Sequence, residues 1–537
     1  MVGSVSGWQE EGTDLKEQFS DYEPLRNSRS RTNSSNQPDE NWAKSRGPQA
    51  DVGEDRKDWL NENAGRKRTD FSKAQIDGDS ISRVDAQNEI TEFAEDEQKT
   101  NPVNQSLTLK RGHSLTYAAL FLFTIILYSR PAEFYPSALT SSIALIVGVI
   151  TLVIFVPSQL SIDGTLTARP REVNLVLLLC LAGLLSIPFA ISPGEAWNTF
   201  NDTFIRCVVI FIVMINVVRT EARLKGLLFL TLIVSIWLSV GAFNDYRLGL
   251  TSVEGYRVAG RGSGIFGNSN DMALHLVTIV PIAVALCFST RNLLRQMMFG
   301  ACAVLMITAI VLTYSRGGSI GLLVSMVFLA WKIGRQRRFA VIVWGLILLV
   351  AVLVLAPGNY ATRLASIFNP SLDAVGSSNM RREILYVSIW TALRHPLFGI
   401  GMGNFHIVSV RELVSHNAYT QVAAEMGVAA LVCYVMFIIA PFRRLGLIAS
   451  ETFAEGRKSR YHYLAIGLQA SLLGYMVTSF FASVAYIWYV YFLVAYAVCL
   501  RRIYESETGK ACILENRSIG KKKQVASQVT SLAGNES

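Results

Sequence analysis

The sequence predicts an all-α, polytopic membrane protein with about 12 transmembrane helices. Hydrophobic residues make up 51% of the 537-residue chain, and its mean hydropathy is positive. Beyond residue 112, apolar runs of roughly 17 to 25 residues recur, each long enough to cross the hydrocarbon core of a bilayer as a helix. The basic residues gather in alternate loops between these runs, as they do in chains that cross a membrane repeatedly.

The first 112 residues differ in composition from the rest of the chain. They are rich in Asp, Glu, Arg, Ser and Asn and almost free of apolar clusters. Such a segment cannot bury enough apolar surface to offset its ordering entropy, so we expect a disordered cytoplasmic tail without a signal peptide at its start. The predicted domains are this N-terminal tail (1–112), a transmembrane domain (113–503) and a cytoplasmic C-terminal tail (504–537).

The apolar runs are separated by polar loops that mark where each expected helix ends. Twelve crossings place both ends of the transmembrane domain on the same side. A long polar loop, 357–415, separates the ninth run from the tenth and is expected outside the cytoplasm. The expected spans are 115–129, 139–157, 172–191, 203–218, 223–243, 270–288, 295–313, 317–333, 339–356, 416–440, 462–482 and 484–500.

The distribution of charge predicts which loops face which side. Loops on the side of the termini contain both lysine and arginine, for example Lys332 and Arg335, and the positive-inside rule makes them cytoplasmic. The loops on the opposite side contain no lysine. The net charge of +9 therefore reflects mainly topology, and it does not indicate nucleic-acid binding.

The cations of these opposite loops are arginines, whose planar fork matches phosphate oxygens. The loop 357–415 is longer than a connection between helices requires, which indicates binding or chemistry. The candidate phosphate-binding residues are Arg257 and Arg261 before the sixth span, Arg316 before the eighth, and Arg381 and Arg382 in the long loop. For Arg316, a cation that snorkels from a helix end to the interface stays an alternative.

A helix of about four turns is expected inside the long loop, from Ser377 to near His395, because Pro396 disfavours helix in the residue before it. Its apolar residues predict that it lies on or against the membrane surface. Arg381 and Arg382 in a first turn oppose the helix dipole, and a bound anion would reverse that effect. Contact with lipid headgroups and a specific phosphate site are both open.

The glycine-rich segment 260–271 precedes a membrane helix instead of following a strand, and no Lys-Ser/Thr pair closes it, so it is neither a P-loop nor a dinucleotide fingerprint. It is interpreted either as a flexible loop ending in a helix cap or as backbone that approaches a glycan or phosphate beside Arg257 and Arg261. The cysteines show no CxxC or Cys/His spacing, so no disulfide framework, metal site or cofactor is predicted.

His416 and Asn417 open the tenth expected span. A histidine at a membrane edge is often structural, but a helix N-terminus keeps an imidazole neutral, as a general base requires. Asn417, Gln421 and Glu425 recur every four residues and predict a polar stripe that faces the bundle. Glu425 is about 180° around a helix from His416, so we expect it to brace the bundle and not to relay the proton.

The run from Arg381 to Gly427 resembles the signature region of the O-antigen ligase and O-antigen polymerase superfamily of bacterial membrane glycosyltransferases. It contains Gly399-Ile400-Gly401-Met402-Gly403-Asn404-Phe405, and later His416-Asn417, nine residues and Gly427. The last part is similar to the His-Asn/Ser-x9-Gly-x-x-Gly pattern of the ligases, with Ala430 in place of the final glycine. Ser315-Arg316-Gly317 and the segment 264–270 resemble two further patches of the family.

This resemblance implies a GT-C-like fold and a glycan transfer in the bacterial inner membrane, without metal or nucleotide sugar. The donor would be an undecaprenyl-pyrophosphate-linked glycan, and the acceptor a hydroxyl of a lipid A-core-like or other glycan at the periplasmic face. On this basis His416 is the expected catalytic base. The expected substrate-binding residues are Arg316, Arg381, Arg382, Arg257, Arg261 and Asn417.

Three alternatives stay open at this point. A polymerase would use a second lipid-linked glycan as acceptor, and a protein ligase would use Ser or Thr. A transporter or flippase for lipid-linked glycans would also have many spans and periplasmic arginines. Transporters usually show matched halves with interrupted helices, whereas the long loop here lies in the second half only, which favours the transferase.

The predicted topology can be tested with reporter fusions. Because lysine-containing loops should be cytoplasmic, a fusion at Gln336 should report the cytoplasm and a fusion at Val375 the periplasm. Identical signals at the two positions would contradict the twelve-span arrangement.

Overall fold

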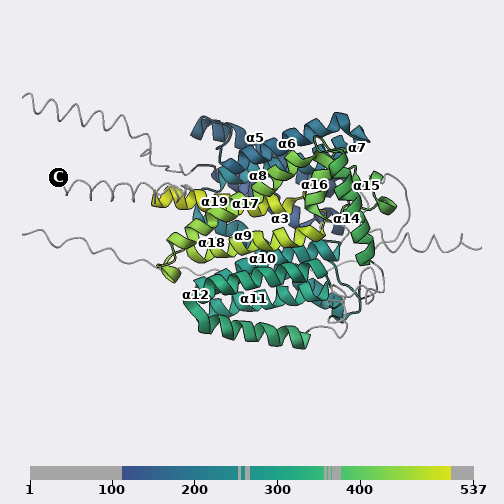
Figure 1. Ribbon diagram of the computed structural model, residues 1–537. Helices are drawn as coiled ribbons and strands as arrows, with labels where there is room; N and C mark the ends of the chain where they lie inside the picture. The colour runs from purple at the N-terminus through teal and green to yellow at the C-terminus, as the bar shows by residue number, and fades with distance from the viewer. Residues whose placement is uncertain are drawn as a thin grey trace, which may run out of the picture. The chain divides into compact units, whose positions relative to one another are not determined.

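The computed structural model describes residues 112–251, 256–260, 266–355, 360, 365 and 377–509. Both expected tails, apart from the residues next to the bundle, lie outside the described residues, as do Arg261 and most of 356–376. Every regular element in the described part is a helix (Figure 1), which confirms the all-α fold class.

The helices reproduce most of the expected spans. Ten of those described are long and apolar enough to cross a membrane, so the chain is a multi-pass membrane protein. The principal helices are α3 (Ser114–Ser129), α5 (Ala138–Asp163), α6 (Arg171–Ser186), α7 (Pro193–Asn198), α8 (Ile205–Val217), α9 (Glu221–Arg247), α10 (Ser269–Ser289), α11 (Leu293–Leu312), α12 (Arg316–Leu355), α14 (Ser377–Arg394), α15 (Phe405–Val408), α16 (Ala418–Met426), α17 (Val428–Glu451), α18 (His462–Thr478) and α19 (Trp488–Thr508).

Two features explain why ten described helices, and not the expected twelve, are long and apolar enough to cross a membrane. α12 consists of two helical arms that meet at Arg337, where the backbone is non-helical (φ −143°, ψ 53°). These arms correspond to the expected spans 317–333 and 339–356 but count as one helix. α19 continues beyond the expected domain boundary at 503, and its last turns carry Arg501, Arg502, Glu505 and Glu507. Twelve crossings therefore stay a prediction.

The expected single span 416–440 is wrong. α16 is a nine-residue helix that ends at Gly427 (φ 87°), and α17 begins directly after it. A Cβ at position 427 would lie 2.4 Å from the Leu397 carbonyl oxygen, so this break requires glycine. His416 thus precedes a helix that is too short to span a bilayer.

The connections between helices gather at two ends of the bundle. At one end, ion pairs join helix ends and connections that are distant in sequence: Arg219 with Asp163 at 2.5 Å, Arg460 with Glu221 at 2.9 Å, and Arg501 with Glu172 at 2.8 Å. The described lysines, Lys225, Lys332 and Lys458, belong to this end, which we call the lysine end.

At the other end, called the loop end, hydrogen bonds join a second set of connections: Ile191 N to Ile400 O at 3.0 Å, Val258 N to Leu312 O at 3.2 Å, and Ser479 Oγ to Tyr419 OH at 3.3 Å. α7, α14, α15 and α16 lie together there (Figure 1). All candidate site residues that are described belong to the loop end.

A glycine-rich turn, residues 399–403, closes onto the end of α16. Ile400 N donates to Ala424 O and Gly401 N to Glu425 O, both at 3.0 Å. Gly399 has φ 67°, and a Cβ there would lie 2.2 Å from the Glu425 carbonyl carbon. Both its backbone conformation and its close approach to α16 therefore require glycine.

Substitution of Gly399 tests how much this close approach contributes. Gly399→Ala should lower stability by about 1–3 kcal/mol more than Gly164→Ala, because overpacking adds to the left-handed strain. Gly164 is a matched control, since it has φ 66° but no atom within 4 Å of an added Cβ. Equal losses in thermal unfolding of the detergent-purified variants would contradict the packing argument.

Candidate functional site at the loop end

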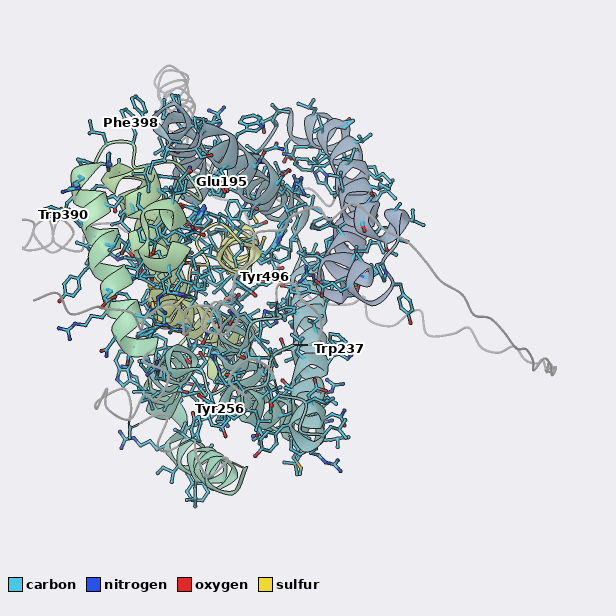
Figure 2. All side chains as sticks on the ribbon, turned by 90° about the vertical axis from the view of Figure 1, so that its right-hand side faces the viewer. Glu195, Trp237, Tyr256, Trp390, Phe398 and Tyr496 are labelled. Carbon is cyan, nitrogen blue, oxygen red and sulfur yellow. The ribbon has the colours of Figure 1, made fainter. Side chains whose placement is uncertain are left out.

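α14 confirms the helix expected within the long loop, and it ends at Arg394 as Pro396 predicts. Its inner face packs onto α16 and α15 through a small apolar cluster of Ile384, Ala392, Phe405, Ala423 and Ala424. Its other face exposes large apolar side chains, Tyr386, Ile389, Trp390 and Leu393, and Trp390 projects from the outer side of the helix (Figure 2). These exposed apolar side chains fit a helix lying against the membrane surface.

Arg381 and Arg382 occupy the second turn of α14, because the described helix begins at Ser377. The effect of a helix dipole is confined to the terminal turn, so the expected dipole argument does not apply to them. Arg382 is exposed and Arg381 is partly buried. Of these two arginines, Arg381 is the one whose charge lowers the pKa of His416.

His416 has a left-handed backbone conformation (φ 49°), which is uncommon for a residue with a side chain. Its ring is partly buried, and no described residue forms a hydrogen bond with it. Burial, and then the positive charge of Arg381, lower the pKa of His416 from 6.5 to about 3. The imidazole is therefore neutral at physiological pH, as expected. The cause is burial together with the charge of Arg381, whereas the sequence suggested a helix dipole.

Asn417 is the N-cap of α16. Its Oδ1 accepts hydrogen bonds from Tyr419 N at 2.9 Å and Thr420 N at 3.2 Å, and so fixes the backbone next to His416. Its Nδ2 is buried and has no hydrogen-bond partner among the described residues. Asn417 therefore combines a structural role with a donor that a substrate oxygen can use.

Glu425 ends the polar stripe of α16 and is 2% exposed. Its Oε1 accepts a hydrogen bond from Phe405 N at 3.3 Å, while burial raises the pKa of this carboxyl to about 7. These contacts tie α16 to the glycine-rich turn, as the bracing role predicts.

A second group of candidate residues meets where α10, α11 and α12 begin or end. Arg257 is buried, and it donates from Nε to Thr313 O at 3.1 Å and from Nη2 to Asn270 Oδ1 at 3.0 Å. The same Asn270 oxygen accepts a hydrogen bond from Ser315 Oγ at 3.0 Å, next to Arg316. Asn270 thus joins the glycine-rich segment to the Arg316 turn, a role that the sequence reading did not assign to it.

The short helix η6 (Ser479–Phe481) lies between these two groups. Tyr419, at the start of α16, donates to Met476 O at 2.8 Å and accepts from Ser479 Oγ. On the other side, Gly317 is packed so closely on Phe481 that a Cβ would lie 2.7 Å from the Phe481 Cβ. The starts of α12 and α16 are therefore held by one common element. η6 contains no charged residue, so the distribution of arginines in the sequence does not point to it.

The loop before α7 is a further part of the site that sequence reasoning missed. Ser192 N donates to Asn404 Oδ1 at 3.1 Å, and the Phe189 and Phe398 rings stack at 4.5 Å. Phe398 and Glu195, which belongs to α7, are labelled in Figure 2. The Glu195 Oε1 atom lies 3.6 Å from His406 Nε2. This loop packs directly on the glycine-rich turn, since a Cβ at Gly401 would lie 2.3 Å from the Ala190 Cβ.

No group of three or more His, Cys, Asp or Glu side chains that could hold a metal ion occurs within the described part of the chain. Metal-independent activity stays a prediction.

Comparison with protein families matches residues 301–435 to the family described as O-antigen ligase. This stretch runs from α11 into α17, so it includes Arg316, α14, the glycine-rich turn and His416-Asn417. None of the curated proteins compared matches the chain.

The electrostatic coupling between Arg381 and His416 can be measured directly. Arg381→Gln should raise the pKa of His416 partway towards 6.5, because it removes a positive charge but leaves the larger effect of burial. The rate at which diethyl pyrocarbonate modifies His416, followed by peptide mass spectrometry, reports the neutral ring. In the wild type this modification rate should stay constant as the pH falls through 6.5. In Arg381→Gln the rate should begin to fall at a higher pH than in the wild type, because the pKa of His416 is higher.

Arg382→Gln is the matched control, since Arg382 is exposed and does not act on His416. A wild-type rate that halves near pH 6.5 would contradict the lowered pKa.

Proposed function

We propose, from the match of residues 301–435 of this membrane protein to the O-antigen ligase family, that it transfers a glycan from undecaprenyl pyrophosphate to an acceptor hydroxyl. The family supports a glycosyltransferase-like enzyme. The lipid-pyrophosphate donor and the assignment of the loop end to the periplasm of a bacterial inner membrane are parts of our proposal.

The observation that carries this proposal is the state of His416. Its imidazole is neutral, partly accessible and free of hydrogen bonds to described residues, with Arg381 close enough to lower its pKa. A neutral ring can accept the proton of an acceptor hydroxyl as that oxygen attacks the anomeric carbon of the donor. A cation beside it suits the negative charge that develops on the departing pyrophosphate.

The other proposed roles follow from the same end of the bundle. Arg381, Arg382 and Arg316 bind the pyrophosphate, and the buried Nδ2 of Asn417 donates to a substrate oxygen. Arg257 assists mainly by holding the Arg316 turn through Asn270. Arg261 is proposed for the same group, although it lies outside the described residues.

In this reaction one C–O bond forms and one breaks. The acceptor oxygen bonds to the anomeric carbon, the bond to the pyrophosphate oxygen breaks, and undecaprenyl pyrophosphate leaves with the electron pair. The proton of the hydroxyl moves to His416 and then to solvent. No metal or nucleotide sugar takes part, so activity should persist in EDTA.

The acceptor separates the remaining alternatives. Purified protein in detergent would be given the lipid-pyrophosphate glycan with a lipid A-core-like acceptor, a second lipid-linked glycan or a Ser/Thr peptide. Transfer to the first supports a ligase, transfer to the second a polymerase, and transfer to the third a protein ligase. Turnover in detergent, where no second compartment exists, would exclude a pure transporter.

His416→Ala should lower the transfer rate in this assay roughly 100- to 10,000-fold, because general-base assistance is lost. The fold should persist, since the ring makes no hydrogen bond within the described chain. His395→Ala, at an exposed position just after α14, is the matched control. A rate for His416→Ala within about threefold of the wild type would overturn the catalytic role.

A further inference from the structure

A basic pocket lies at the lysine end, away from the candidate site. It is a cavity of about 180 Å³ between α12, α17 and α18, lined by Lys332, Arg335, Ala449, Ser450, Phe453, His462 and Ile466. α12 and α18 both run from this pocket to the loop end, where the opposite ends of these helices contact each other through Gly321 and Thr478. Nothing assigned to glycan transfer involves this pocket.

Aromatic rings hold the two cations of the pocket in place. The Lys332 ammonium lies 5.6 Å from the centre of the Phe328 ring and 5.2 Å from that of Trp331. The Arg335 guanidinium lies 5.1 Å from the centre of the Phe453 ring. Cation–π contacts orient a cation without neutralising its charge.

No described acidic side chain lines the pocket or forms an ion pair with Lys332 or Arg335. Glu451, which follows Ser450 in α17, accepts a hydrogen bond from Tyr504 OH at 2.8 Å. Elsewhere at this end, cations such as Arg219, Arg460 and Arg501 are paired with carboxylates. The positive-inside rule accounts for basic residues here, but not for two of them that converge on a cavity whose described lining contains no acidic side chain.

The break in α12 shapes one wall of the pocket. The Gln336 side chain donates to Phe453 O, and Arg337 Nε donates to Tyr463 OH at 3.1 Å, so the end of the first arm of α12 is tied to the α17–α18 connection and to α18. These bonds hold the segment that carries Lys332 and Arg335 against Phe453 and His462. The cavity is therefore built from fixed elements.

We propose that this pocket binds the phosphate group of an anionic phospholipid from the leaflet at the lysine end. Two unneutralised cations between membrane helices match a phosphodiester, and basic pockets of this kind bind anionic headgroups in other membrane proteins. The lipid stabilises the joint between α12, α17 and α18 because it binds the folded state.

The test uses the full-length protein, delipidated in a non-ionic detergent and then given phosphatidylglycerol, phosphatidylcholine or inorganic phosphate. Native mass spectrometry measures the retained lipid, and thermal unfolding measures protection. Phosphatidylglycerol should be retained and should raise the melting temperature, whereas phosphatidylcholine should do neither. In the double variant Lys332→Gln/Arg335→Gln, retention should fall about tenfold or more, since each cation near a headgroup contributes to binding.

Arg338→Gln/Arg443→Gln is the matched control, because it removes two exposed cations near the same end that do not line the pocket. A second variant, Ser450→Trp, fills the pocket from an exposed position while both cations remain, and it should also lose the lipid. Equal loss in the control, or full retention in Ser450→Trp, would overturn the site. Equal protection by inorganic phosphate alone would overturn the lipid as its occupant.

Discussion

The arrangement at the loop end depends on the contact between the glycine-rich turn and α16. The main chain of the turn bonds directly to the last residues of α16, and the buried Glu425 carboxyl accepts Phe405 N. Leaving these buried amides without partners would cost about 1–3 kcal/mol each. This contact sets the position of α16 relative to α14, and both helices carry candidate residues.

The electrostatics of His416 follow from that packing. α14 packs on α16 through an apolar cluster that includes Ile384 and Ala424. This packing places the positive charge of Arg381 close enough to His416 to lower the pKa of its imidazole. Burial and this cation act in the same direction and keep the ring neutral. The same cation is suited to a phosphate oxygen, so this pair of side chains would meet two requirements of the glycosyl transfer that we propose.

The sequence predicted the features that local patterns determine and missed those that depend on tertiary contacts. Pro396 and the spacing of apolar residues located α14, and the basic segment around Arg337 separated the two arms of α12. The break at Gly427 lies inside a continuous apolar run and becomes necessary only because the Leu397 carbonyl approaches it. The joining role of Asn270 likewise depends on residues distant in sequence, so no local pattern could reveal it.

The most direct test of the central claim is the stereochemistry of the product. If a hydroxyl activated by His416 displaces the pyrophosphate in a single step, the new glycosidic bond must have the anomeric configuration opposite to that of the donor. NMR of the purified product, with the donor as reference, measures this configuration through the anomeric coupling constants. The account predicts inversion, and a product that retains the donor configuration would contradict it.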